Sequence, residues 1–343
     1  VAERYDIPDN LAAWNERVMR ELTYLKSFGL QLVSFPIWDL EALPAMDDPE
    51  LVPVVSLHTT YKMAKPFKPE WSLRPLYEFN MVERVIAAER QLLQRAPRIL
   101  ANSNAIVDIL QREYGVDLSN RHEVIAHGTD DPLALPERAA LAQQRDEQML
   151  AGDKLRVLYV GRFEPRKGFD IAAAVAEKLL AHGNIEMRFV GDKLSATWER
   201  RLRLGGSKLD QSDNLRFLGV VERTELDDAY AEADLVLTPS RFESFGLVAI
   251  EAMAAGRPVL ALNAGGLGEV VNNGVDGLNW EDGDGVADSI SEAIIALDHD
   301  RARLHQLGRA ARASFEEKFT TGRMVEGIER FYRESLEQGR KAA

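Results

Sequence analysis

Two glutamates, Glu243 and Glu251, stand with seven residues between them in the second half of the chain. A carboxylate only accepts hydrogen bonds, so acids of this kind suit the hydroxyl groups of a sugar better than they suit a phosphate. Glu251 also lies in a largely apolar run, where an unpaired carboxylate would be costly. The alternative interpretation is structural, with Glu243 favoured by the dipole of a helix start and Glu251 on the surface. We favour ligand binding by both acids.

The residues between the two glutamates predict the start of a helix. A buried strand over residues 235–238 is followed by a turn and then by a helix over residues 247–255. The unpaired backbone N–H groups near this start would point at an anion bound over the helix. Gly246 has no side chain and permits close approach of such a ligand. The segment concerned is Ser244, Phe245, Gly246 and Leu247.

A loop that carries two cations follows another predicted strand, over residues 155–160. It runs from Gly161 to Gly168 and contains Arg162 and Lys167. A planar guanidinium and a mobile ammonium both bind phosphate oxygens, so the pair suits a diphosphate. Taken alone, the loop can also be interpreted as an ordinary solvated turn.

Two weaker features lie at the ends of other predicted strands. The adjacent glycines Gly265 and Gly266 predict a further loop lined by backbone amides. His58 follows a strand over residues 52–57 and could donate a hydrogen bond near a reacting centre. Because a lone histidine is more often structural, His58 alone does not indicate a site.

Strands that alternate with helices must position these loops. In the second half of the chain this alternation predicts a parallel sheet covered by helices on both faces, and ligands of such sheets bind at the carboxyl ends of the strands. The first half also has an α/β pattern. The predicted strands are residues 30–38, 52–57, 98–102, 123–126, 155–160, 186–190, 215–218, 235–238 and 258–262, and the predicted helices are residues 10–28, 83–96, 105–114, 170–181, 225–233, 247–255 and 286–297.

Size and composition are those of a globular protein. The 343 residues, of which 45% are hydrophobic and 28% charged, predict two domains. A formal net charge of −13 argues against a general affinity for nucleic acid or anionic lipid. The absence of cysteine excludes disulfides and thiolate chemistry, and no apolar run approaches the ~20 residues that a transmembrane helix needs.

A polar stretch around Pro132 and Pro136 predicts the domain boundary. We expect a partial, acceptor-side Rossmann-like domain over residues 1–133 and a linker region over 134–153. A nucleotide-sugar-binding Rossmann-like domain should follow over 154–320, and a C-terminal helix over 321–343 should pack back toward the first domain.

Together, these motifs resemble those of the family 4 retaining glycosyltransferases. The strongest match is the E-x7-E segment from Glu243 to Glu251. His127-Gly128-Thr129-Asp130 departs from the usual Asn-Gly-Val-Asp, so His127 is given no role. The resemblance runs from about residue 9 to residue 332. Its other matches are Ala252-Met253-Ala254-Ala255-Gly256-Arg257-Pro258-Val259, Gly161-Arg162 with Lys167-Gly168, Ala264-Gly265-Gly266 with Glu269, His58-Thr59, and Ala101-Asn102-Ser103.

The resemblance implies a GT-B fold, with two Rossmann-like parallel-sheet domains facing across a cleft. It implies that Arg162 and Lys167 neutralise the diphosphate of the donor in place of a metal ion. Glu243 would contact the donor sugar, which His58 would hydrogen-bond across the cleft, and Glu251 would bind the ribose. The base would lie near Gly191-Asp192 and Val220-Val221. The remaining implied donor-binding residues are Gly161, Val221, Ser244, Phe245, Gly246 and Leu247.

The implied activity is that of a retaining hexosyltransferase that needs no metal ion or other cofactor. A sugar would pass from a UDP, GDP or ADP donor to a carbohydrate or lipid-linked acceptor, with a phosphate oxygen as base. The run Asp282-Gly283-Asp284 resembles a metal-binding DxD motif, but before a predicted helix it is better interpreted as a capping turn.

Three alternatives stay open: a nucleotide-sugar epimerase, a disaccharide phosphorylase, and a non-catalytic domain that binds sugar nucleotides. We expect a cytoplasmic location, with attachment to the inner face of the membrane as a further expectation. We expect no nucleic-acid partner.

One departure from the family concerns the start of the chain. Members begin with a strand and a glycine-rich loop, whereas the first family element here is the helix from Asn10. Truncation, supply of this piece by another chain, or its omission from the sequence would each explain the difference. We therefore expect an incomplete acceptor site and a chain that binds donor better than it turns it over.

Overall fold

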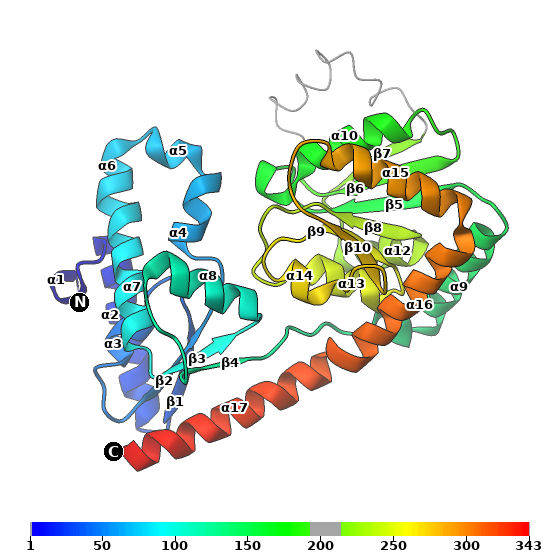
Figure 1. Ribbon diagram of the computed structural model, residues 1–343. Helices are drawn as coiled ribbons and strands as arrows, with labels where there is room; N and C mark the ends of the chain where they lie inside the picture. Colours follow the sequence, from blue (N-terminus) through cyan, green and yellow to red (C-terminus); the bar gives the residue numbers. More distant parts are fainter. Residues whose placement is uncertain (1, 193–213, 343) are drawn as a thin grey trace. The chain divides into compact units, whose positions relative to one another are not determined.

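A computed structural model describes residues 2–192 and 214–342. The chain divides into two compact units, residues 1–126 with 324–343, and residues 127–323. Each unit is an α/β domain built on a parallel sheet (Figure 1). Among the described residues, no helix combines the length and the apolar character needed to span a membrane.

The first unit contains a four-stranded parallel sheet in the order β1-β2-β3-β4. Over residues 2–126 its helices are short except for α2, α7 and α8. Both ends of α8 are set by its sequence: Ser103 accepts a hydrogen bond from Ile106 N at 3.2 Å, and Gly115 ends the helix at φ +60°. The strands are β1 (Leu32–Pro36), β2 (Val52–Ser56), β3 (Arg98–Ala101) and β4 (His122–Val124), and the helical segments are α1 (Ala2–Tyr5), α2 (Asp9–Lys26), α3 (Ala42–Ala45), α4 (Tyr61–Ala64), η1 (Lys65–Phe67), α5 (Pro69–Ser72), α6 (Pro75–Tyr77), η2 (Glu78–Glu83), α7 (Arg84–Arg95) and α8 (Asn104–Tyr114).

The last helix, α17 (Thr321–Ala342), belongs to the first unit from Met324 onward. The guanidinium of Arg98 lies 4.7 Å from the centre of the Phe331 ring, and its Nε donates to Ser335 Oγ at 3.1 Å. A side chain on Gly339 would meet Val52 at 2.4 Å. The helix is therefore packed closely against the sheet of this unit.

The second unit contains a six-stranded parallel sheet in the order β10-β9-β8-β5-β6-β7, and every pairing in it is parallel. The strands are β5 (Leu155–Val160), β6 (Ile185–Val190), β7 (Leu215–Gly219), β8 (Leu235–Thr238), β9 (Val259–Leu262) and β10 (Gly277–Trp280), and the helical segments are η3 (Pro132–Ala134), α9 (Pro136–Leu150), η4 (Pro165–Lys167), α10 (Phe169–Leu179), α12 (Arg223–Glu232), α13 (Leu247–Ala254), α14 (Leu267–Val270), α15 (Val286–His299) and α16 (Arg301–Lys318).

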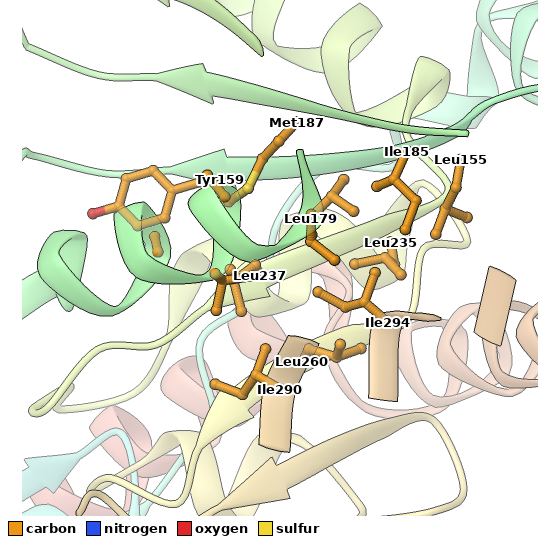
Figure 2. Close-up of a cluster of buried hydrophobic side chains, with 14 of the residues drawn as sticks. Leu155, Tyr159, Leu179, Ile185, Met187, Leu235, Leu237, Leu260, Ile290 and Ile294 are labelled. Carbon is orange, nitrogen blue, oxygen red and sulfur yellow. The ribbon is translucent and has the colours of Figure 1, made fainter. Parts of the chain in front are cut away.

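The core of this unit lies between one face of the sheet and helices α10 and α15 (Figure 2). Successive side chains of a strand point to opposite faces, so Leu155 and Tyr159 of β5 lie on the same side as Leu235 and Leu237 of β8. The other face is covered as well, since α12 contacts β5 and α13 contacts β8. Strands buried on both faces explain the nearly continuous apolar runs.

The segment expected to be a linker, residues 134–153, forms helix α9 and belongs to the second unit. Pro136 occupies the first turn, where proline is well tolerated, and alanine, glutamine and arginine are good helix formers. Arg138 of α9 donates to Asp228 of α12 at 2.9 Å. The polar composition reflects a helix that is partly exposed, and the two units meet in the sequence between Ala126 and His127.

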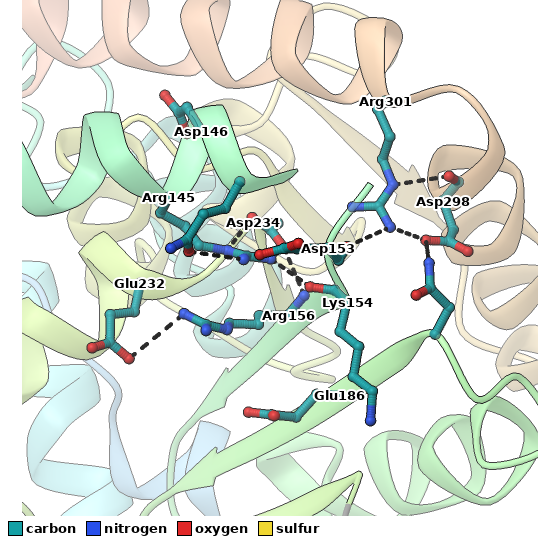
Figure 3. A network of polar contacts seen from close by, with 12 residues as sticks. Arg145, Asp146, Asp153, Lys154, Arg156, Glu186, Glu232, Asp234, Asp298 and Arg301 are labelled. Carbon is teal, nitrogen blue, oxygen red and sulfur yellow. Dashed lines mark hydrogen bonds and ion pairs between the residues drawn. The ribbon is translucent and has the colours of Figure 1, made fainter. Parts of the chain in front are cut away.

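A buried ion pair ties α9 to the sheet at the amino ends of the strands (Figure 3). Arg145 Nε donates to Asp234 at 2.8 Å, and both side chains are at most 2% exposed. Asp234 also accepts from the backbone N–H of Arg156 at 2.7 Å. Asp234, the residue that precedes β8, thus joins α9 to β5.

Candidate functional site

The chain reverses its direction of travel across the second sheet between β5 and β8. Strands β6 and β7 extend the sheet on one side of β5, and the chain then returns to place β8 on the other side. Loops that leave the carboxyl ends of two strands diverge at such a switch point, and ligands bind in the space between them. The loops after β5 and β8 carry the residues singled out from the sequence.

The loop after β5 is packed directly against the loop after β8. The backbone N–H of Arg241 donates to the carbonyl of Arg166 at 2.9 Å. A side chain on Gly168 would lie 1.8 Å from the carbonyl oxygen of Pro239, and Gly168 has φ +65°. Only glycine satisfies both constraints at this position.

Lys167 and Glu243 form an ion pair at this point, with 2.5 Å between Nζ and Oε1. Their side chains are 19% and 14% exposed, so the pair is shielded but reachable. The structure therefore brings together the cation expected for phosphate and the acid expected for sugar. A diphosphate bound here would compete with Glu243 for the ammonium.

Arg162 lies on the same loop but is more open to solvent. Its side chain is 52% exposed and forms an ion pair with Glu164 at 3.0 Å. Gly161, which begins the loop, is packed against β6: a side chain on Gly191 would lie 2.1 Å from its carbonyl oxygen. The loop is fixed at its base, whereas the guanidinium of Arg162 can move toward a ligand.

Tyr159, near the end of β5, supports the loop that follows this strand and was not identified from the sequence. Its hydroxyl lies 3.0 Å from the carbonyl of Arg162 and 3.3 Å from that of Lys167. Burial raises the pKa of Tyr159, with a further contribution from Glu164, so the phenol remains a neutral donor. The only sequence signal for this role is a tyrosine near the carboxyl end of a largely aliphatic strand.

Arg241 joins three loops and was also missed. It donates two hydrogen bonds of 2.7 Å to the carboxylate of Asp170, one of 2.8 Å to the carbonyl of Pro165, and one of 3.0 Å to Asp282. Asp282, in the acidic turn before α15, is therefore a partner of arginine in this structure. A planar guanidinium is suited to such a three-way junction.

The loop after β9 interlocks with the start of α13. Gly266 N donates to the carbonyl of Glu243 at 2.9 Å, and a side chain on Gly265 would lie 2.2 Å from the same oxygen. Gly246 has φ +119° and precedes the first helical residue, Leu247. The N–H groups of Leu247 and Val248 come before the first hydrogen bond of α13, from Ala249 N to the carbonyl of Gly246 at 3.0 Å, which leaves them for a ligand.

Phe245 differs from its neighbours because its side chain is 4% exposed. Its ring meets the rings of His127 and Phe319 edge to face, with centroids 5.2 and 6.0 Å away. The side chain therefore anchors the loop, and only the backbone of Phe245 is placed to contact a ligand. His127, to which the sequence assigned no role, packs on this anchor.

Glu251 is not an isolated carboxylate. Arg223 Nη1 donates to one of its oxygens at 2.6 Å, and the hydroxyl of Tyr230 donates to the other at 2.9 Å. Both partners come from α12, which follows Val221. The side chain of Glu251 is 15% exposed, and each oxygen retains acceptor capacity for a ribose hydroxyl. Arg223 and Tyr230 lie two helical turns apart, so helical spacing could have paired them.

Replacing Tyr230 by phenylalanine should weaken nucleotide binding by roughly five-fold. Tyr230 is 1% exposed, and removal of its hydroxyl takes away one hydrogen bond that fixes Glu251, a loss of about 1 kcal/mol. Calorimetric titration with the preferred nucleotide measures the change. Tyr24→Phe, at an exposed tyrosine of the first unit, should bind as the wild type does, and an equal loss in both variants would contradict this role.

His58 lies in the first unit, two residues after the end of β2. Burial lowers its pKa, so the imidazole is neutral at neutral pH and can donate one ring N–H. The other predicted site residues lie in the second unit, between Gly161 and Glu251. The interaction of His58 with a donor sugar therefore remains a proposal.

The loop after His58 is held by a buried acid that the sequence did not reveal. Glu89 of α7 is 0% exposed, and it accepts hydrogen bonds from Tyr61 N at 2.8 Å and from the Tyr114 hydroxyl at 2.5 Å. Burial raises the pKa of Glu89 to about 7, against the lowering effect of Tyr114 and the backbone N–H groups of Tyr61 and Lys62.

The stability of the first unit should therefore fall as the pH rises from about 5 to about 8. In this window the unfolded chain releases the proton of Glu89 while the folded chain still binds it, a difference of roughly 3 kcal/mol. Thermal unfolding at about pH 5 and about pH 8 measures this dependence, and Glu89→Gln should remove most of it. The control Glu329→Gln changes an exposed acid and should leave the dependence intact. Equal pH dependence in wild type and Glu89→Gln would disprove the assignment.

The part of the chain that carries the loops of the second unit is similar to known proteins. The family model of the glycosyl transferases group 1 matches residues 142–314. A D-inositol 3-phosphate glycosyltransferase of Segniliparus rotundus is 30% identical over 342 residues, 97% of this chain and 73% of the relative. One of Rhodococcus jostii is 37% identical over 195 residues, 55% of this chain and 42% of the relative. The chain spans about half the length of several such relatives.

Solved structures agree on the fold. Sucrose-phosphate synthase from Thermosynechococcus elongatus has a TM-score of 0.73 at 24% identity, over 95% of this chain and 79% of that one. Anabaena HepE in complex with UDP has a TM-score of 0.69 at 23% identity, over 89% and 79%. The expected GT-B type, with two Rossmann-like parallel-sheet domains, is confirmed. Fold and family match agree, and the chain belongs to the group 1 glycosyl transferases, the family 4 type that its motifs resemble.

Proposed function

We propose that the chain transfers a hexose from a nucleotide-diphosphate donor to a carbohydrate or lipid-linked acceptor, with retention of configuration and without a metal ion. The observation that carries the proposal is the ion pair of Lys167 and Glu243 at the switch point of the second sheet. It places a cation for the diphosphate beside an acid for the sugar. The start of α13 and Glu251 continue the same segment of chain.

Each part of the donor has a complementary group. The ammonium of Lys167, the mobile guanidinium of Arg162 and the N–H groups at the start of α13 stabilise the charge that develops on the departing diphosphate. Glu243 accepts hydrogen bonds from sugar hydroxyls, and Glu251, oriented by its partners on α12, accepts from the ribose. His58 donates to the sugar, and the base lies near Val221.

Retention follows if the acceptor hydroxyl attacks the anomeric carbon from the side on which the diphosphate leaves. The bond from the anomeric carbon to the phosphate oxygen breaks as the bond to the acceptor oxygen forms. The proton of the acceptor hydroxyl passes to the departing phosphate oxygen. No protein base is needed, and Glu243, paired with Lys167, serves to bind the sugar.

Turnover with a panel of acceptors tests the activity. The chain is incubated with each nucleotide sugar and a chelator, together with D-inositol 3-phosphate, simple hexoses or a lipid-linked sugar. The proposal is supported if nucleoside diphosphate is released and the acceptor gains a sugar that has the same anomeric configuration as in the donor. An epimerised donor without acceptor, a requirement for free phosphate, or binding without turnover would instead identify an epimerase, a phosphorylase or a non-catalytic domain.

A further inference from the structure

The corner between α5 and α6 gathers exposed apolar side chains at the tip of the first unit, away from its sheet (Figure 1). Leu73 is 82% exposed, Leu76 79% and Phe79 72%. Every residue from 72 to 77 is exposed. Apolar groups gathered in this way on a soluble domain usually mark a surface that another partner covers.

Contacts among residues 61–83 hold the corner in place. The ring of Trp71 stacks on Tyr61 at 5.4 Å and 21°, and Glu78 N donates to the carbonyl of Arg74 at 2.9 Å. Lys65 forms ion pairs with Glu78 at 2.6 Å and with Glu83 at 2.5 Å. The exposed leucines and phenylalanine therefore project from a braced segment.

The same segment carries a small net positive charge although the chain is acidic. From Thr60 to the end of η2, residues 60–83 contain four basic and three acidic residues, whereas the whole chain has a net charge of −13. Lys68 lies 3.7 Å from Glu70, and no ion pair of Arg74 is found among the residues that the structure describes. Apolar side chains that lie beside Arg74, which has no such pair, and Lys68, whose pair with Glu70 is long, resemble the pattern of an interfacial membrane anchor.

We propose that the α5–α6 corner docks on an anionic lipid surface. Leu73, Leu76 and Phe79 enter the boundary between headgroups and acyl chains, and Lys68 and Arg74 lie against lipid phosphates. The net charge of the chain opposes general attraction to such a surface, so the contact is confined to this corner. The proposal does not depend on the donor site, but it would bring the chain to a lipid-linked acceptor.

A second copy of the chain fits this surface less well. A two-fold interface brings the same patch of both copies together, and here it would oppose cation to cation. An anionic lipid surface satisfies the charges and the apolar groups at once, which is why we assign the corner to lipid.

Co-sedimentation of the chain with vesicles tests the assignment. We expect binding to vesicles of phosphatidylcholine mixed equally with phosphatidylglycerol, and at least about ten-fold weaker binding to phosphatidylcholine alone. The variant Leu73→Ser/Leu76→Ser/Phe79→Ser should lose binding by at least about ten-fold. The variant Lys68→Glu/Arg74→Glu should lose it specifically for the anionic vesicles.

A matched control lies at the end of α2 in the same unit, where Tyr24, Leu25 and Phe28 are also exposed and Phe28, like Phe79, is 72% exposed. Tyr24→Ser/Leu25→Ser/Phe28→Ser should keep full binding. Circular dichroism and nucleotide binding should be unchanged in all three variants. Absence of vesicle binding by the wild type, equal losses in the control, or self-association that the corner variant abolishes would each overturn the proposal, the last by identifying a second copy as the occupant.

Discussion

Lys167→Ala should lower kcat/KM for donor turnover by about 100- to 1,000-fold. Lys167 is the shielded cation at the switch point, and its side chain is 19% exposed. The charge on the departing diphosphate would then lack its nearest positive group. Glu243, 2.5 Å from that ammonium, would also lose its partner and repel the ligand. Release of nucleoside diphosphate, followed at varied donor concentration, measures the effect.

The matched control is Lys178→Ala. Lys178 lies on α10 of the same unit and forms an exposed ion pair with Asp288, so it carries the same charge without contact to the site. Its kcat/KM should stay within about two-fold of the wild type, since an exposed pair contributes little. If Lys167→Ala is as active as Lys178→Ala, Lys167 does not take part in the mechanism.

Arg145→Ala should destabilise the second unit by about 3–5 kcal/mol. The substitution leaves the carboxylate of Asp234 buried beside β5 without its counter-charge (Figure 3). Burial already raises the pKa of Asp234 even with Arg145 in place. Since Asp234 also accepts from the backbone of Arg156, the register of β5 against β8 depends on it. Chemical denaturation followed by circular dichroism measures the loss.

Arg333→Ala provides the comparison for this change. Arg333 is 78% exposed and lies 3.7 Å from Glu329, so its loss should alter stability by less than about 0.5 kcal/mol. A loss below about 1 kcal/mol in Arg145→Ala would mean that the buried pair does not support the second unit.

Periodicity was sufficient for most strands and helices that position the site. Residues 155–160 and 235–238 were predicted as strands and form β5 and β8 with the same bounds. Strands buried on both faces carry continuous apolar runs. The loops after β5 and β8 begin with Gly161 and Pro239, each of which ends such a run. The loops could therefore be placed at one edge of a sheet before its strand order was known.

Elements whose sequence gives a weak or misleading signal were missed. Helix α9 is polar because only four of its residues are buried, among them Arg145, which is buried as an ion pair. Strand β10 has four residues, and three of them are only partly buried. The segment from α4 to η2 consists of very short helical turns, which have too few residues for a period to appear.

The partners of the site residues could not be read from the sequence for a different reason. Glu251 looked like an unpaired acid because Arg223 and Tyr230 come from another helix, more than twenty residues away. Tyr159 donates to backbone carbonyls, and such contacts leave no pattern in side-chain types. Arg241 donates mainly to the carboxylates of Asp170 and Asp282, which lie 71 and 41 residues away in the sequence. Long-range pairing is set by the packing of whole elements, which a local pattern does not contain.

Calorimetric titration of the wild-type chain with UDP-, GDP- and ADP-sugars, in the presence of a chelator, tests the central claim most directly. We expect one nucleotide to bind, with the affinity reduced at least about ten-fold in Lys167→Ala and in Glu251→Ala. Binding that appears only when Mn²⁺ is added would contradict a site that relies on Lys167, Arg162 and backbone amides. Failure of every nucleotide sugar to bind would contradict a donor site at the switch point altogether.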